Sequence, residues 1–478
     1  MAILGFHLVL TLISASVLQK LSARYSLGRR LLAKGLRRFV APHVDELKQA
    51  AGHASIKGKR HRRNHDKDDE NDSFPVPKSV DIPLIESVVH GYDVIQLPFY
   101  VDYRWLVDFT LATVVVYVIS ECYAYLTFGA YTSELNLSII WCLVTLGFSL
   151  KCLASLTAMY FHSVKDTGER SLVLCIGAVY FLVSFAFLLG IERFFDVTMH
   201  AAYENFTATA NDFLKEQDLD VKRSIQTSIV LYVFFSVLFG VLGGMLVFPA
   251  FRYSKMYADS LRHAEGKPFT KLFIHINFFA PLFALLLWVR PFTASLLRRQ
   301  PAIVTAGQLE SLRMWAIVVV FVLRFVMFRT SIQAYLNVAR DRVERLKLEA
   351  GRIDSRELQN MISGIFMFVC VAASQYLVPV VLMFACNLLL KTLGAYSWVT
   401  PFGFPDIRLP FLASLVAREP QMFGSASSDL RASLLTVAQL FNVEVNRGVW
   451  SFILVMITSI NVSLNLIGVV YNMRFENR

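Results

Sequence analysis

The sequence contains none of the short motifs by which the common enzyme sites are recognised. There is no G-x-S-x-G nucleophile turn, no H-E-x-x-H zinc motif, no Walker A phosphate loop and no G-x-G-x-x-G dinucleotide loop. Each of these motifs positions reactive groups for one kind of chemistry, so their absence argues against the familiar hydrolases, zinc peptidases, nucleotide hydrolases and dinucleotide-dependent oxidoreductases. We therefore expect a protein that is not an enzyme and that holds neither a cofactor nor a metal.

Cysteine is also scarce, with six residues in a chain of 478. All six lie inside apolar runs: Cys122, Cys142, Cys152, Cys175, Cys370 and Cys386. Disulfide frameworks are typical of small secreted domains with cysteines in their loops, which this pattern does not resemble. We expect six free, buried thiols.

Charged residues are few, at 17% of the chain, whereas hydrophobic residues make up 55%. Several uncharged runs reach the length of about 18 residues at which an apolar helix can cross a bilayer. The net charge is +11, but the basic residues cluster beside the apolar runs. This distribution is typical of membrane topology and of contacts with anionic lipid headgroups, so we expect no nucleic-acid partner.

The apolar runs predict an all-α fold, a polytopic transmembrane helical bundle of about nine spans. The expected spans are residues 1–18, 105–127, 137–161, 171–191, 225–248, 272–289, 312–336, 361–390 and 449–470. Seven basic residues and no acidic residue follow the first run, between Lys20 and Arg38. Basic flanks favour the cytoplasm, so we expect an uncleaved anchor with its N-terminus outside or in the lumen, and a cytoplasmic C-terminus. Residues 290–311 are an exception to this rule, because the predicted topology places them outside although they hold three arginines and one acidic residue.

The same pattern divides the chain into five parts. We expect an N-terminal anchor (1–18), a cytoplasmic basic helix and disordered linker (19–104), the bundle of spans two to eight (105–394), a luminal or extracellular cap (395–448), and the last span with a cytoplasmic tail (449–478). Residues 25–40 read as an amphipathic helix on the inner leaflet, and Lys20 to Arg38 as a contact with anionic lipids. Residues 428–443 predict a second amphipathic helix, in the cap. The alternating charge blocks between residues 57 and 72 are typical of disorder.

A glycosylation sequon lies in the acidic segment between spans four and five. It begins at Asn205, and this segment falls on the external side of the predicted topology. Two further sequons begin at Asn136, which abuts a span, and at Asn71, which lies in the cytoplasmic linker. We therefore predict a glycan at Asn205 alone.

Five charged side chains lie within the predicted spans: Asp108, Glu121, Lys151, Arg324 and Arg329. A cation at mid-span costs from about 2.5 kcal/mol to more than about 10 kcal/mol, so such residues usually have partners. Counting depth along straight helices, we expect Glu121 to pair with Lys151 or Arg324, and Asp108 to lie level with Arg329. These charges fix helix packing or form an ion or proton path. Snorkelling to the cytoplasmic surface is a third interpretation, better suited to Arg329.

Prolines and polar residues mark two further spans. Span six contains His275, Asn277 and Pro281, and span eight contains Gln375 and Pro379. A proline frees a backbone carbonyl, which either coordinates a cation or is accommodated in an ordinary kink. Span eight is longer than a bilayer core, so it must tilt, bend at Pro379 or project outside. In span five, a G-x-x-x-G pair at Gly240 and Gly244 predicts close helix packing within the bundle.

Several short stretches resemble one known family. They are QAYLN, EAGRI and ELQ between residues 333 and 359, LLLKTLG at 388–394, WLVDF at 105–109, GERS at 168–171, HINFFAPL at 275–282 and LLWVRP at 286–291. On these motifs, which extend to about Gly394, the chain resembles the transmembrane protein 161 family of metazoa. The resemblance implies a multi-pass protein of the endoplasmic reticulum or plasma membrane, linked to calcium handling and excitability. It implies the endoplasmic-reticulum calcium pump as one partner, and it carries over no catalytic residue.

Two functions fit these observations. The first is a regulatory or accessory subunit of an ion pump or channel that modulates ion homeostasis, with calcium as the expected ion. The second is an ion or small-solute transporter or channel in its own right, which the buried charges and proline-broken spans would serve.

Overall fold

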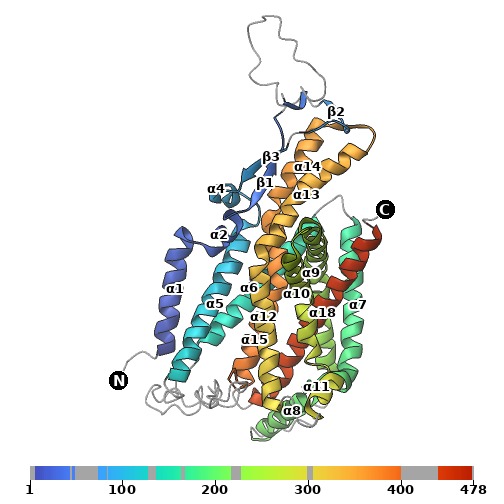
Figure 1. Ribbon diagram of the computed structural model, residues 1–478. Coiled ribbons are helices and arrows are strands. Elements are labelled where there is room, and N and C mark those ends of the chain that lie inside the picture. Colours follow the sequence, from blue (N-terminus) through green and yellow to red (C-terminus); the bar gives the residue numbers. More distant parts are fainter. Residues whose placement is uncertain are drawn as a thin grey trace, which may run out of the picture.

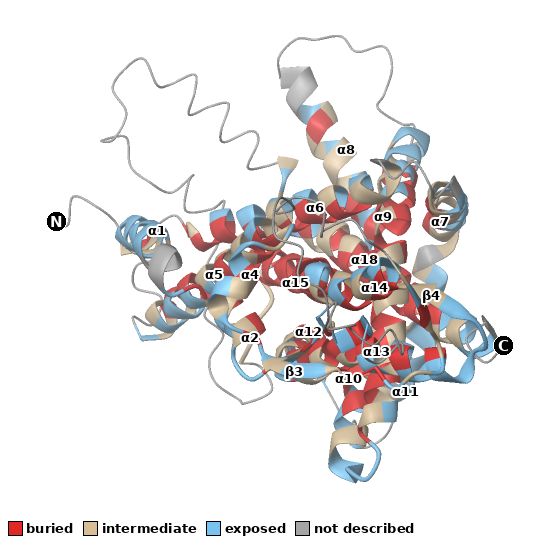
Figure 2. Cartoon of the chain, turned by 90° about the horizontal axis from the view of Figure 1, so that it is seen from above, coloured by how far each residue is buried: buried red, intermediate tan, exposed pale blue. Residues whose placement is uncertain are grey.

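The central element of the fold is helix α15 (Val369–Leu393), around which the other apolar helices pack. The computed structural model describes residues 6–43, 46–48, 74–82, 84–126, 136–162, 167–216, 228–298, 305–399 and 440–475 (Figure 1). Every residue of α15 from Val369 to Thr392 is buried. Figure 2 shows α15 inside the bundle, with α1 (Phe6–Arg24) and α7 (Thr167–Phe194) at its periphery. A helix that is apolar all round can be buried on every side, and α15 is.

The helices that surround α15 are long and apolar. They are α5 (Tyr100–Leu126), α6 (Ser138–His162), α9 (Ser228–His263), α10 (Pro268–Leu286), α12 (Ala306–Val326) and α18 (Val443–Phe475). In the described residues, seven helices are long and apolar enough to cross a membrane, and α12 with α13 (Phe328–Leu348) makes an eighth if that bent pair is one span. The all-α polytopic bundle is thus confirmed. A count of nine spans requires α1 as well, but its apolar stretch Phe6–Lys20 is shorter than the other candidate spans. The ninth span therefore stays a prediction.

The two ends of the bundle differ in character. Figure 1 shows α13, α14 (Ser355–Met367) and the strands at one end, and α8 (Met199–Glu216) and α11 (Arg290–Arg298) at the other. The beginning of α1 and the end of α18 lie at opposite ends of the bundle. That arrangement is the one an odd number of crossings requires. Which end faces the cytoplasm stays a prediction.

The predicted basic helix at residues 25–40 is only partly correct. Helix α2 (Leu27–Ala33) begins at the N-cap Ser26 and stops before Gly35, which has a φ of +79°. A positive φ is unfavourable for residues with a Cβ, and here it reverses the chain into strand β1 (Arg37–Val40). Strand β1 pairs antiparallel with β3 (Ile85–Val88), and the short helix α4 (Gly91–Ile95) follows.

The predicted linker is therefore not disordered throughout. A second pair of strands, β2 (Pro75–Pro77) and β4 (Arg352–Asp354), joins it to the segment after α13. The charge blocks at residues 57–72 lie outside the described residues, as do most of the predicted cap and most of the amphipathic helix at 428–443. The sequence signal missed the strands because each is only three or four residues long.

Two helix breaks shape the upper half of the bundle in Figure 1. Pro379, one of the places considered for a bend, lies inside the continuous helix α15; the helix is interrupted at Phe368, and α14 lies beside α13. The second break, at Met327, bends α12 against α13 by 45°. Whether this overlong span tilts in a bilayer or projects from it stays a prediction.

Glycine packing joins α7 to α9. A Cβ at Gly240 would lie 3.1 Å from the Gly177 carbonyl oxygen, and one at Gly244 would lie 3.2 Å from the Val173 carbonyl oxygen. The small residues thus let two backbones approach closely within one chain, as predicted for the G-x-x-x-G pair.

All six thiols are free, as predicted. Four of them are buried, but Cys122 and Cys175 are exposed on the outside of the bundle, where the expectation of burial was wrong. Periodicity within a fully apolar helix does not distinguish a face packed on protein from one packed on lipid, because both are apolar.

Candidate functional site

Arg324 is the largest fully buried side chain near the centre of the bundle. It lies in the last turn of α12, just before the break at Met327, and its residue is 2% exposed. Its guanidinium carbon is 3.7 Å from the ring centroid of Tyr253 on α9 and 5.0 Å from that of Tyr376 on α15. Three helices thus close around one cation.

Polar groups from two more elements complete this arrangement. The Tyr376 hydroxyl donates to the Arg324 backbone carbonyl at 3.1 Å and accepts from the Ser331 hydroxyl at 3.4 Å. Asn277 on α10 donates from Nδ2 to the hydroxyls of Tyr376 and Tyr253, at 3.3 Å each. We call these five residues, Arg324, Tyr253, Tyr376, Asn277 and Ser331, the arginine cage.

The cage holds a charge without a counter-ion from the described part of the chain. No carboxylate there forms an ion pair with Arg324, and its Nε has no hydrogen-bond partner. A desolvated cation–π contact contributes about 2 kcal/mol or more, against an insertion cost that starts at about 2.5 kcal/mol. Two rings can therefore offset much of the lower estimate of the cost, and they fix where the side chain lies.

The predicted pairing of Glu121 with Arg324 or Lys151 is wrong. Glu121 on α5 accepts from Lys391 on α15, with Nζ 2.5 Å from Oε1, and the two side chains are only 12% and 8% exposed. Lys391 follows directly on the predicted end of span eight, so it was not counted among the buried charges. The ring of Tyr117 lies beside the same ammonium, with its centroid 6.0 Å away.

The other predicted charges also have different partners. Lys151 is exposed and lies 3.8 Å from Asp102 at the start of α5. Asp108 is buried and accepts from the Ser26 hydroxyl at 3.2 Å. Arg329 donates to the Gly35 carbonyl at 2.9 Å rather than meeting Asp108. Counting depth along straight helices failed here, because the bend after Met327 carries Arg329 toward the turn before β1.

Gln375 is the centre of a second polar contact in the bundle. It accepts from Arg252 Nε at 3.1 Å and donates to the Tyr160 hydroxyl at 3.0 Å. Arg252 also lies over the ring of Tyr335, 5.5 Å from its centroid. The predicted span five ends at residue 248, whereas α9 continues as a helix to His263 and carries Arg252 into the bundle.

The proline-rich spans do not assemble a cation site among the described residues. Pro281 and Pro379 both lie inside continuous helices, and the Nδ1 atom of His275 is 2.8 Å from the Tyr257 hydroxyl. No group of three or more His, Cys, Asp or Glu side chains in the described ranges is arranged to hold a metal ion. Of the two interpretations of the prolines, accommodation within the packed bundle is the one the geometry favours.

A further charged cluster, which was not predicted from the sequence, lies at the end of the bundle near α8 and α11. Arg313 pairs with Asp196 at 2.7 Å, and Arg447 lies 4.0 Å from Glu310. The Arg447 guanidinium also sits 4.5 Å from the ring centroid of Tyr396. Burial raises the pKa of Tyr396, and the positive charge of Arg447 opposes that shift.

Asn205 lies on helix α8 rather than in a loop. Its amide donates to Glu444 Oε2 at 2.7 Å and accepts from Asn442 Nδ2 at 2.5 Å, which ties α8 to the start of α18. Glycosylation of Asn205 stays a prediction, and a glycan there would compete with these contacts.

Comparison with known proteins adds one match. A family model described as predicted transmembrane protein 161AB matches residues 2–476. No solved structure matches the chain.

Proposed function

Because this chain belongs to the family of predicted transmembrane protein 161AB, we propose that it is a regulatory or accessory membrane protein that modulates ion homeostasis. Calcium is the ion we propose to test first, with the calcium pump of the endoplasmic reticulum as the partner. Family membership and the apolar helices make it a multi-pass integral membrane protein. We propose the endoplasmic reticulum or the plasma membrane as its location.

One observation carries this proposal: three polar side chains of the central helix are engaged by neighbouring helices. Gln375, Tyr376 and Lys391 on α15 bond to α9, α10 and α5 respectively. Such contacts hold a helix in place, whereas a conduction path needs polar groups that face water and exchange partners. The arrangement supports a rigid body that acts on a partner.

A specific feature also supports the second candidate, a transporter or channel. The α12–α13 pair is broken by 45° beside a buried arginine, and broken helices next to charged residues line the substrate sites of many transporters. In that case the arginine cage would open to admit a solute. We rank this candidate second because both tyrosine rings lie against the guanidinium.

The test is a co-reconstitution of the purified chain with the endoplasmic-reticulum calcium pump. We expect a changed calcium uptake rate or calcium affinity relative to vesicles that hold the pump alone. A matched vesicle set with an unrelated helical membrane protein controls for crowding. Identical pump activity in all three sets would contradict the proposal for this pump.

A further inference from the structure

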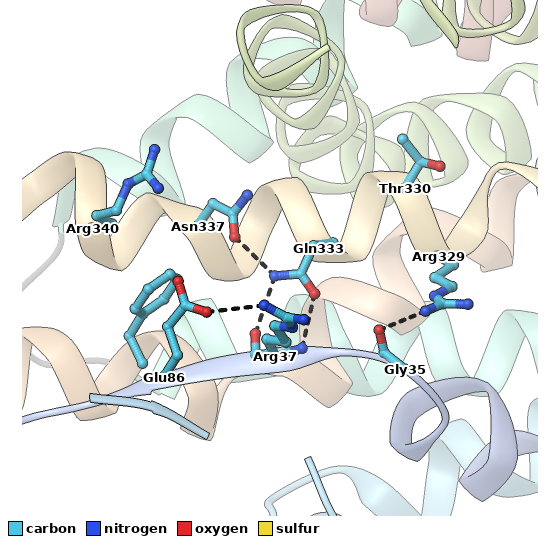
Figure 3. A pocket seen from close by; sticks show the side chains of 9 residues that line it. Gly35, Arg37, Glu86, Arg329, Thr330, Gln333, Asn337 and Arg340 are labelled. Atoms are coloured by element: carbon cyan, nitrogen blue, oxygen red, sulfur yellow. Dashed lines mark hydrogen bonds and ion pairs between the residues drawn. The ribbon is translucent and has the colours of Figure 1, made fainter. Parts of the chain in front are cut away.

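A basic pocket opens between strand β1 and helix α13. Its volume is about 400 Å³, and it is lined by Gly35, Arg37, Phe39, Glu86, Arg329, Thr330, Gln333, Asn337 and Arg340 (Figure 3). Three arginines and one carboxylate belong to this lining. No part of the function proposed above uses it.

The wall of this pocket is held by backbone contacts. Gln333 accepts from the Arg37 amide at 2.9 Å and donates to the Arg37 carbonyl at 3.1 Å, as a neighbouring strand would. Arg329 donates to the Gly35 carbonyl at 2.9 Å. Figure 3 shows these bonds joining β1 to one face of α13. The arginines are therefore carried on a fixed frame before any ligand arrives.

The charge of the pocket is only partly neutralised. Arg37 Nη1 lies 3.2 Å from Glu86 Oε2, but the two side chains are 68% and 47% exposed, so this pair is weak. Arg340 pairs with Glu344 in the next turn of α13 at 3.3 Å, also at the surface. Arg329 has no carboxylate partner among the described residues. The pocket thus offers cationic donors to an anion, and arginine forks match phosphate oxygens well.

The position of the pocket indicates a lipid. Val326, one turn before Arg329, is 65% exposed at the end of the apolar α12, as expected of a residue that faces lipid. Val88, which pairs with Arg37 across the sheet, is 52% exposed, and Tyr92 on α4 is 84% exposed. Exposed apolar and aromatic residues around basic ones are typical of the headgroup layer.

We propose that this pocket binds a phosphorylated inositol, supplied as the headgroup of a phosphoinositide lipid. The volume lies in the range of small-molecule sites, about 300–1,000 Å³, so it admits a sugar-sized ring with its phosphates rather than a lone phosphate. The arginines take the phosphate groups, while Gln333 keeps β1 against α13. The Glu86 carboxylate repels the phosphate groups, and in the absence of ligand it forms an ion pair with Arg37.

The test measures binding of a fluorescent short-chain phosphatidylinositol 4,5-bisphosphate to the full-length protein in detergent. We expect binding to weaken about fivefold for each arginine removed in Arg37→Gln and Arg340→Gln. Arg342→Gln, on the same helix but outside the pocket, is the charge-matched control and should bind like the wild type. Glu86→Gln should bind more tightly, a gain that misfolding cannot produce.

Competitors distinguish the source of the ligand. We expect unlabelled phosphoinositide to displace the probe at least tenfold better than soluble inositol 1,4,5-trisphosphate or phosphatidylserine. Equal displacement by the soluble trisphosphate would overturn the lipid assignment, and equal displacement by phosphatidylserine would overturn headgroup recognition. Equal losses in the pocket variants and in Arg342→Gln, or no loss in any of them, would overturn the site.

Discussion

Lys391 on the central helix α15 donates to Glu121 on α5 across 2.5 Å, with both side chains about nine-tenths buried. This ion pair joins two elements 270 residues apart in the chain. Removing one partner of a buried pair leaves an uncompensated charge, which typically costs about 3–5 kcal/mol, whereas replacing both with apolar residues is often tolerated.

We predict that Lys391→Met and Glu121→Leu each lower the free energy of unfolding of the purified protein by about 3–5 kcal/mol. The double variant should recover most of the loss. Fluorescence-detected size-exclusion chromatography after heating measures this. Lys151→Met is the control, because its exposed pair with Asp102 should matter little. Additive losses in the double variant would show that the two residues do not interact.

The arginine cage predicts a graded response at Tyr253. Tyr253→Phe keeps the ring that covers Arg324 and loses only a hydroxyl, whereas Tyr253→Leu loses the ring itself. We expect Tyr253→Leu to cost about 2 kcal/mol more than Tyr253→Phe in the free energy of unfolding. Equal stability of the two variants in the same heating assay would argue that the cation–π contact contributes nothing.

Glycine packing predicts a position-dependent effect of one methyl group. Gly240→Ala places a Cβ 3.0 Å from the Phe181 Cβ, while nothing lies within 4 Å of a Cβ at Gly147. Overpacking of this kind costs about 1–3 kcal/mol, so Gly240→Ala should unfold earlier and Gly147→Ala should not. The melting temperatures of the two variants are measured in the same detergent. Equal values would exclude a tight α7–α9 interface.

The sequon at Asn205 leads to a prediction about glycosylation and about the orientation of the bundle in the membrane. If α8 faces the lumen, endoglycosidase treatment should increase the mobility of the wild type and leave Asn205→Gln unchanged. A C-terminal tag should be digested in sealed microsomes, since it lies at the opposite end of the bundle. A protected tag together with an unglycosylated Asn205 would reverse the predicted orientation.

The sequence predicted the bundle well because long apolar runs can form only helices in a membrane. It also identified Arg324, Glu121, Asn277 and Gln375 as buried polar residues, and all four lie within packed helices. The partners of these residues could not be predicted, because pairing depends on which helices are neighbours and on the bend at Met327. Neither follows from counting residues along straight spans.

The strands and the basic pocket were missed for a related reason. Strand β1 holds four residues, and the pocket forms only when they pack against α13; the contacting residues Arg37 and Gln333 lie 296 positions apart. The seven basic residues from Lys20 to Arg38 predict a contact with anionic lipid, which stays a prediction, and they gave no sign of a pocket. Contacts between distant short segments carry no periodic signal in the sequence.

Ion flux from the chain alone tests the central claim, a packed polar core that serves regulation rather than transport. Purified protein in liposomes loaded with a calcium indicator is compared with empty liposomes, with and without a membrane potential. We expect equal calcium entry in both, with Tyr253→Leu used to ask whether opening the cage creates a leak. Selective, saturable flux through the wild-type protein without any pump would contradict the claim and favour a transporter.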